Sequence, residues 1–304
     1  MPSFVKSEII PLAGSASLLN NNLSCGAESN FAVAHRSVVH TVTMTSTDTK
    51  VNHRSLGSKE GNGTPSNALV NQVKWVELKS RSLLVIATHK GIQIYGPDLS
   101  QLLFFHSLSN QGDSSVFARG IASVDDQFVC VGTSRATIRG HNCAIADLDG
   151  DGQLMASGDG EGIIRIWQAS GQTLECRHII NETNNDYVTS IRLIKDRAVA
   201  VGYGKGQIRI FDVQKAILLA EIGAHARAVS ALSVSPSTSL LASVSEDSFL
   251  RVFQLVSSSG SFEISQAHAE CLTDMQLTGV VFVSESKIAT VAFDSSEIIL
   301  LTDN

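Results

Sequence analysis

The chain contains little proline, few aromatic side chains and no excess of basic residues. Only 5 of its 304 residues are proline and 6% are aromatic, which excludes a collagen-like or proline-rich chain. Lysine and arginine together number 23, against 29 for aspartate and glutamate, which gives a net charge of −6. Because nucleic-acid-binding domains usually carry a basic excess, the composition predicts no nucleic-acid partner.

Long apolar runs and closely spaced cysteines are also missing. No run approaches the roughly 20 apolar residues of a membrane-spanning helix, so we expect no transmembrane segment. Lys6, Glu8 and Pro11 interrupt the N-terminal stretch, which is therefore unlike a secretory signal. The 5 cysteines lie far apart and form no CxxC pair, which indicates thiols in a reducing compartment rather than disulfides or a zinc site. The predicted location is cytoplasmic.

A repeat near 42 residues runs along the chain. A small residue followed by histidine recurs at 140–141, 224–225 and 267–268, and these histidines are 84 and 43 residues apart. Strings such as GIIRIW end in an aromatic residue at spacings of 44 and 42 residues. Between these markers, short alternating apolar runs are bounded by Gly, Asp and Ser, which is typical of β-strands. The markers are Gly140-His141, Ala224-His225 and Ala267-His268, and Trp167, Phe211 and Phe253.

A repeat of this length with about four short strands has the size of one blade of a β-propeller. Seven such repeats need about 294 residues, close to the length of the chain. We therefore predict an all-β, seven-bladed propeller as a single domain. The predicted boundaries are a closing strand at 1–13 and blades at 14–57, 58–110, 111–139, 140–181, 182–223, 224–266 and 267–304.

These repeats resemble the WD40 repeat family. In that family a histidine, a serine or threonine, an acidic residue and a tryptophan share hydrogen bonds inside a blade. The resemblance implies three such sets, in which Glu161 stands for the usual aspartate and Phe253 and Leu300 replace tryptophan. The sets are His141, Ser157, Glu161 and Trp167; His225, Ser243 and Asp247; and His268, Thr290 and Asp294.

Longer strings are similar to one family within the WD40 repeats. They include VFARGIAS at 116–123, QFVCVGT at 127–133 and AHARAVSAL at 224–232. This closer resemblance implies a non-enzymatic, intracellular platform for protein partners. It leaves self-association and peripheral association with vesicles or membranes open, and it implies no cofactor.

One repeat is shorter than the others. Tyr95 and Trp167 are 72 residues apart, whereas two repeats need about 84 to 88. We therefore expect the blade at 111–139 to lack its outer half, as a shortened isoform or a gene-model error would explain. Such a blade would expose a strand edge.

The two ends of the chain complement each other. The last repeat ends soon after its third strand, and the apolar segment Phe4–Leu12 precedes the first blade. We expect this segment to supply the missing outer strand and to close the ring.

An acidic run is a candidate calcium site. Asp147, Asp149 and Asp151 alternate and are followed by glycine, which resembles the start of a calcium loop. However, Gly158 stands where an EF-hand needs glutamate, and Met155 stands at the final acidic position of an integrin-type propeller repeat. A polar hairpin turn is therefore favoured, and a calcium-responsive adhesion propeller is the alternative function.

No catalytic arrangement is evident. The recurring His, Ser and Asp fall inside blades, and no serine lies in a GxSxG elbow. The glycine-rich Gly202–Gly206 lies between strands, without the helix that a phosphate site requires. We predict that the chain is not an enzyme.

The leading hypothesis is a scaffold that binds protein partners at one rim of the propeller. Propellers usually bind where the first strand of each blade begins, and Arg and Tyr are enriched in interfaces. The predicted rim residues are Arg119, Tyr187, Arg227 and Glu270, with Tyr203 and Glu246 in nearby turns.

Overall fold

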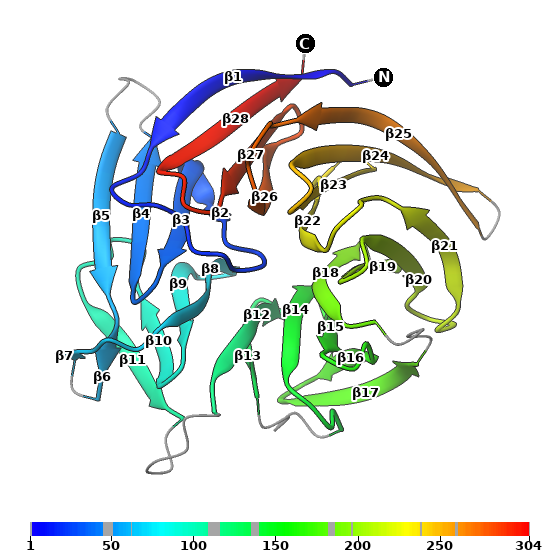
Figure 1. Cartoon of the computed structure of the whole chain (residues 1–304). Coiled ribbons are helices and arrows are strands. Elements are labelled where there is room, and N and C mark those ends of the chain that lie inside the picture. The colour runs from blue at the N-terminus through cyan, green and yellow to red at the C-terminus, as the bar shows by residue number, and fades with distance from the viewer. Residues whose placement is uncertain are drawn as a thin grey trace.

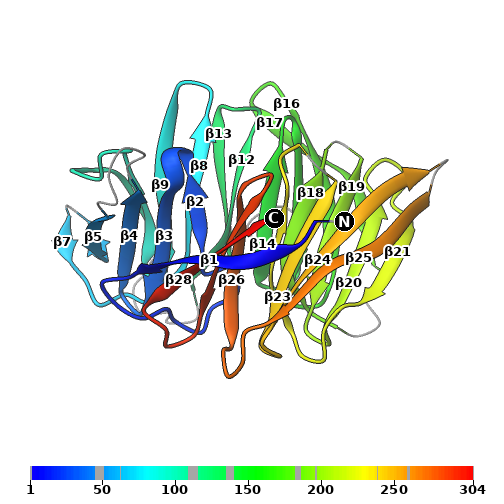
Figure 2. The same cartoon turned by 90° about the horizontal axis from the view of Figure 1, so that it is seen from above.

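Short antiparallel strands form a ring of sheets around a common centre (Figure 1). The computed structural model describes residues 2–44, 51–61, 63–108, 116–134, 140–181, 186–195, 197–237, 239–258 and 261–303. Seen from the side, the inner strands run from one face of the ring to the other (Figure 2). One face therefore carries the entrances to the innermost strands.

Within these ranges, six sheets have four strands each. Five of them use consecutive strands, and the sixth combines the C-terminal strands with the N-terminal one. The first two are β2 (Ser24–Gly26), β3 (Asn30–His35), β4 (Val38–Met44) and β5 (Val51–Gly57), and β8 (Val70–Leu78), β9 (Arg81–Thr88), β10 (Gly91–Tyr95) and β11 (Leu102–Ser107). A short hairpin of β6 (Lys59–Glu60) and β7 (Thr64–Pro65) lies between them in sequence.

The remaining four-stranded sheets follow in the second half of the chain. They are β14 (Ile145–Asp151), β15 (Leu154–Asp159), β16 (Ile164–Ser170) and β17 (Thr173–Ile180); β18 (Val188–Ile194), β19 (Ala198–Tyr203), β20 (Gln207–Asp212) and β21 (Leu218–Gly223); β22 (Val229–Val234), β23 (Leu240–Ser245), β24 (Phe249–Ser258) and β25 (Ser261–Cys271); and β26 (Leu277–Ser284), β27 (Lys287–Ala292) and β28 (Glu297–Asp303) with β1 (Phe4–Pro11).

The expectation of seven blades is wrong, because the described residues form six four-stranded blades. The segment expected to form another blade contains a two-stranded sheet of β12 (Ala118–Val124) and β13 (Phe128–Thr133). Only residues 134–144 separate β13 from β14, too few for two further strands of ordinary length and their turns.

The core lies between neighbouring sheets. In β19 and β23 every residue is buried, because both faces of each strand pack against an adjacent sheet. These strands are rich in Ala, Val and Leu, which suit close packing between sheets. The fold thus has no single centre of hydrophobic packing but a layer of it between each pair of sheets.

The first strand of the chain pairs with the last. β1 lies antiparallel to β28, from Phe4 opposite Asp303 to Pro11 opposite Glu297 (Figure 1). The Phe4 ring is fully buried and meets Phe282 edge to face at 6.4 Å. The N-terminal segment therefore takes the outermost position in a sheet whose other strands come from the C-terminus.

The segment between β1 and β2 reaches into the centre of the ring (Figure 1). Asn21 adopts a left-handed conformation with φ of 57°, which asparagine tolerates better than most residues. Its backbone N–H donates to the carbonyl of Ser230, and that of Asn22 donates to Thr278 (both 3.0 Å). This segment is thereby attached to the inner strands β22 and β26.

Candidate functional site

His141 lies at the centre of a buried hydrogen-bond chain in the sheet β14–β17. Its Nδ1 is 2.7 Å from Asp159 Oδ2 and its Nε2 is 2.6 Å from Ser157 Oγ. Trp167 donates its indole N–H to the same Ser157 Oγ at 2.8 Å. The polar side-chain atoms of His141, Ser157, Asp159 and Trp167 therefore all have partners, which is what burial of such groups requires.

The carboxylate in this set is Asp159 rather than Glu161. Strand β15 ends at Asp159, whose carboxylate also accepts the backbone N–H groups of Glu161 and Ile163. The turn therefore places Glu161 as a backbone donor. The sequence does contain a signal for the correct residue, because Asp159 lies two positions before Glu161, between Gly158 and Gly160.

A second set forms around His225 in the sheet β22–β25. His225 Nδ1 is 3.1 Å from both carboxylate oxygens of Asp247, and its Nε2 is 2.8 Å from Ser243 Oγ. Burial lowers the pKa of His225, although Asp247 opposes part of that shift. Phe253 is buried beside this set without contributing a hydrogen-bond donor.

The third predicted set does not assemble. His268 lies within β25, opposite Val252, and its ring contacts Phe4 at 5.9 Å. Thr290 donates instead to the carbonyl of Gly279, and Asp294 is exposed. The reason is the length of β25, which continues to Cys271 and keeps His268 away from the entrance of β26.

The acidic run 147–151 lies on strand β14 rather than in a hairpin turn. Asp147 is completely buried and accepts hydrogen bonds from Arg192, Gln72 and Asn21, at 2.8, 3.1 and 3.1 Å. These donors come from β18, from β8 and from the segment between β1 and β2. Asp147 thus joins distant parts of the ring.

The other two aspartates have different surroundings. Asp149 accepts from Lys74 Nζ at 3.0 Å and from the backbone of Leu193 at 3.0 Å, whereas Asp151 is exposed at the end of β14. Within the described ranges, no group of three or more His, Cys, Asp or Glu side chains is placed to hold a metal ion. Arg192 and Lys74 of the same chain pair with the carboxylates of Asp147 and Asp149, respectively.

Two predicted rim residues lie elsewhere. Arg119 is half-buried on the inner strand β12; burial lowers its pKa, and the nearby Asp147 carboxylate opposes that shift. Tyr203 is buried, with the Arg209 guanidinium 5.2 Å from the centre of its ring. The alternation of side chains along an inner or second strand turns both residues away from the rim.

The remaining rim residues gather on one face. Tyr187 is 50% exposed before β18, Arg227 is exposed before β22, and Glu246 is half-buried in the turn after β23. Glu270 is half-buried near the end of β25. Entrances to first strands and turns between second and third strands occupy the same face of an antiparallel blade.

A pocket of about 540 Å³ opens on this face, with Arg227 and Glu246 on its wall. Asp247 and Asp274 also line it, so its three carboxylates outnumber its single arginine. Such a pocket is complementary to a lysine or arginine side chain of a partner.

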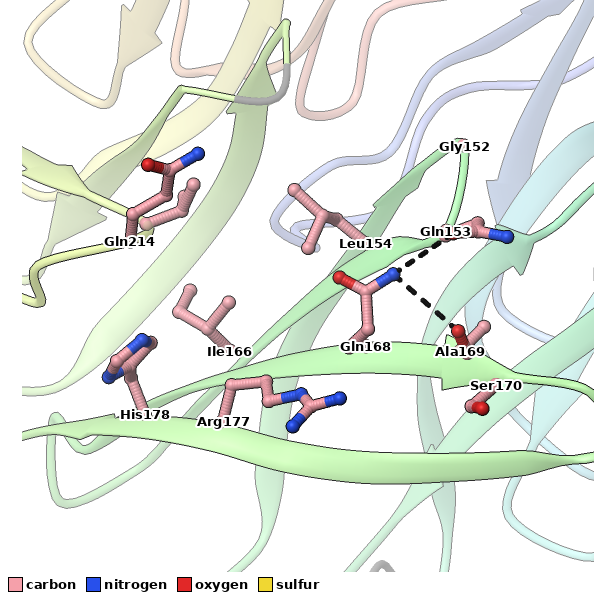
Figure 3. A pocket seen from close by; sticks show the side chains of 11 residues that line it. Gly152, Gln153, Leu154, Ile166, Gln168, Ala169, Ser170, Arg177, His178 and Gln214 are labelled. Atoms are coloured by element: carbon pink, nitrogen blue, oxygen red, sulfur yellow. Dashed lines mark hydrogen bonds between the residues drawn. The ribbon is translucent and has the colours of Figure 1, made fainter.

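A larger groove of about 820 Å³ lies where sheets β14–β17 and β18–β21 meet (Figure 3). Leu154 and Ile166 form an apolar part, and Gln168, Arg177, His178 and Gln214 point into or around it. Gln168 donates to Gln153 Oε1 at 3.2 Å and to the carbonyl of Ala169 at 3.5 Å. The groove lining includes no carboxylate, and nothing in the sequence pattern predicted it.

Among the described residues, no helix is long and apolar enough to cross a bilayer.

Comparisons with known proteins identify similar chains. A family model described as WDR54 matches residues 3–147 and 136–302. WD repeat domain 54 of Rattus norvegicus is 33% identical over 334 residues, covering 97% of this chain and 98% of that protein. WD repeat-containing protein 54 of Homo sapiens is 31% identical over 327 residues, covering 95% and 96%.

Solved structures resemble the chain in fold. One chain in a crystal structure of the mitotic checkpoint complex has a TM-score of 0.76 at 16% identity, covering 98% of this chain and 91% of that one. The WD40 repeats of RRP9 have a TM-score of 0.74 at 13% identity, covering 99% and 100%. Together these similarities show a WD40 β-propeller.

Proposed function

The chain belongs to the WDR54 family of WD40 propellers, and from this premise we propose that it is a non-enzymatic intracellular scaffold for protein partners. The two assembled His–Ser–Asp groups are buried between strands, with their hydrogen bonds directed at one another. This arrangement favours a structural role for them over nucleophilic catalysis, which needs a reachable hydroxyl and an oxyanion site.

The observation that carries the proposal is the acidic pocket on the rim face. Arg227 and Glu246 were expected at a binding rim and share one pocket, with Asp274 beside them. Exposed Tyr187 lies before the neighbouring inner strand on the same face. Tyrosine and arginine side chains are enriched among binding hot spots.

A charge-reversal experiment tests this surface. Capture from cell extract, followed by mass spectrometry, compares the unaltered chain with a Glu246→Arg/Asp274→Arg variant. The control is Lys215→Glu, an exposed residue in the turn between β20 and β21 on the opposite face. We expect a small set of proteins to be lost with the double variant and retained by the control. Identical sets from all three chains would contradict the proposed surface, and sedimentation of the same samples reports self-association.

We also propose that the β12–β13 sheet is the inner half of a shortened blade and that β1 closes the ring. The two strands occupy the place in the ring between full sheets (Figure 1). Support for closure comes from the β1–β28 ladder and from Ser3, whose N–H donates to Asp303 at 2.6 Å.

A further inference from the structure

A cavity at the centre of the ring is distinct from both the rim pocket and the groove. Its volume is about 140 Å³, and it shares no lining residue with either of them. Most of its lining comes from the inner strands β2, β8, β14, β18, β22 and β26, which surround the centre in Figure 1. Since a water molecule occupies roughly 30 Å³, such a volume suits a ligand of about five non-hydrogen atoms.

The charged side chains at this centre carry more positive than negative charge. Lys74, Arg192 and Asp149 line the cavity, and Lys74 Nζ is 3.0 Å from Asp149 Oδ1. Arg192 Nη1 is 2.8 Å from Asp147 Oδ2, outside the lining, and the half-buried Arg119 also lies near Asp147. Three cations therefore meet two carboxylates, although the whole chain has a net charge of −6. The local excess favours a negatively charged ligand.

Two serines of the lining have hydroxyl protons to donate. Ser24 Oγ accepts the backbone N–H of Trp75 at 2.8 Å, and Ser233 Oγ accepts that of Phe282 at 3.0 Å. A serine hydroxyl also has one proton of its own, and no described residue accepts either of these two protons. Both serines are buried. Because a buried donor without an acceptor is unfavourable, the two hydroxyls favour a ligand that accepts hydrogen bonds.

The cations have further donors, whereas the carboxylate of the lining is already in use. Lys74 uses one of its three N–H donors and Arg192 uses three of its five. Asp149 accepts from Lys74 at one oxygen and from the backbone N–H of Leu193 at the other. A surplus of donors suits an anion with several oxygens, whereas a metal cation would need oxygen ligands that are available to it.

The cavity can be reached from solvent. The side chains of Lys74, Arg192 and Asp149 are 25, 18 and 16% exposed, so a small solute can contact them. Cys25 of the lining adds no charge, because burial, and to a smaller extent the Glu77 carboxylate, raise the pKa of its thiol to about 12. Glu77 itself is exposed, and water and salt therefore screen its charge.

We propose that the central cavity binds a tetrahedral oxyanion of the phosphate type, either as inorganic phosphate or as the phosphate group of a monoester. Its oxygens accept hydrogen bonds from Lys74, Arg192 and the two serine hydroxyls, and charge-assisted bonds of this kind are the strong ones. Because the lining strands belong to six different sheets, a bound anion links them and stabilises the folded ring by mass action.

Calorimetric titration of the full chain with inorganic phosphate, at constant ionic strength, is the primary measurement. We expect saturable heat at about millimolar phosphate or below. Lys74→Gln keeps a donor for Asp149 but removes the charge, and should weaken binding by about tenfold or more, the usual cost of losing a charged hydrogen bond. Lys74→Arg should retain binding. The matched control is Lys90→Gln, since Lys90 also pairs with a carboxylate, Glu60, but outside the cavity.

Hydrogen exchange locates the bound anion without any substitution. The amides of Trp75 and Phe282 donate to the two serines of the cavity, so phosphate should slow their exchange. This measurement tests the proposal even if Lys74→Gln fails to fold. A titration with O-phosphoserine identifies the source of the anion, because tighter binding than that of phosphate indicates a monoester and weaker binding indicates the free ion.

Three results would overturn the assignment. They are the absence of saturable heat with both ligands, equal affinities of Lys74→Gln and Lys90→Gln, and slowed exchange only at amides away from the cavity. Arg227→Glu, on the rim face, should leave phosphate binding unchanged. A failure of the cavity proposal would therefore leave the proposed scaffold surface intact, and the reverse also holds.

Discussion

At the scale of single residues, the stability of the blades depends on polar groups that satisfy one another. Ser157 Oγ receives the indole N–H of Trp167 and lies within hydrogen-bond distance of His141, so one hydroxyl links strands β15 and β16 to the entrance of β14. The net contribution of such a bond is modest, about 0.5–1.5 kcal/mol, but leaving one partner buried and unpaired costs more.

The two tryptophans provide a matched test. Trp167 and Trp75 are similarly buried, but Trp75 Nε1 has no hydrogen-bond partner within the described residues. Trp167→Phe should therefore reduce the free energy of unfolding by about 1 kcal/mol more than Trp75→Phe does. Urea denaturation measures both, and equal losses would show that the indole donor does not stabilise the blade.

Acid should destabilise the protein through His225. Its folded pKa is lowered by burial, so the unfolded chain, with a histidine pKa of about 6.5, binds the proton more readily. Stability from this group is present above about pH 6.5 and falls as the pH decreases towards the folded pKa. Burial and the neighbouring His35 and His53 lower the pKa of His40 in the same direction.

Denaturation curves between about pH 4.5 and 8 measure this effect. We expect His225→Gln to be less stable at neutral pH and to show a flatter dependence, with part of the remaining slope due to His40 and part, at the acid end, to carboxyls with lowered pKa values such as Asp159. An unchanged slope in the variant would exclude His225 as a source of acid sensitivity.

At the scale of elements, β1 is the strand whose removal has the clearest consequence. Phe4 and Ile10 are buried within the sheets, whereas Val5 is 41% exposed on the same strand. Phe4→Ala should reduce stability by about 3–5 kcal/mol, the usual cost of truncating a buried phenylalanine. Val5→Ala should cost far less, because its side chain contacts solvent.

Deleting residues 2–12 should lower the melting temperature more than Phe4→Ala, since it also removes the ladder with β28. Thermal unfolding followed by circular dichroism compares the three variants. A deletion variant that melts like the full chain would mean that β1 contributes little to the ring.

The sequence predicts the positions of individual strands better than it predicts the number of blades. Alternating apolar runs and the repeated aromatic endings locate most strands, because a blade is built from residues close in sequence. The pair His225 and Asp247 was expected from the resemblance to WD40 repeats, but His268 does not join Thr290 because β25 extends beyond the expected boundary. The side chain of Tyr203 turns inward for a similar local reason, namely strand alternation.

At the scale of the whole molecule, the centre of the ring depends on contacts that no repeat can reveal. Asn21 and Asp147 are 126 residues apart and hydrogen-bond at 3.1 Å. Asn21 also accepts from Ser190 at 2.7 Å. Such contacts form only when the sheets are arranged around a centre, so the spacing of residues within one repeat cannot predict them.

Asp147 accepts hydrogen bonds from three parts of the chain that meet at this centre. Its side chain is fully buried and that of Arg192 is 18% exposed. Asp147→Asn should cost about 3–5 kcal/mol, because Arg192 would remain partly buried without its carboxylate. Asp151→Asn, at the exposed end of the same strand, is the control and should change stability little. Chemical denaturation measures both, and similar values would contradict a central role for Asp147.

The pairing of β1 with β28 has a mechanical consequence. The first residue of the ladder, Phe4, lies opposite Asp303, so both chain ends leave the sheet at the same end of the strand pair. Tension applied through the two ends would therefore break the rungs one after another, starting at Phe4, rather than shearing them together. In a single-molecule pulling experiment we expect β1 to detach first and at low force, after which the remaining sheets bear the load one by one.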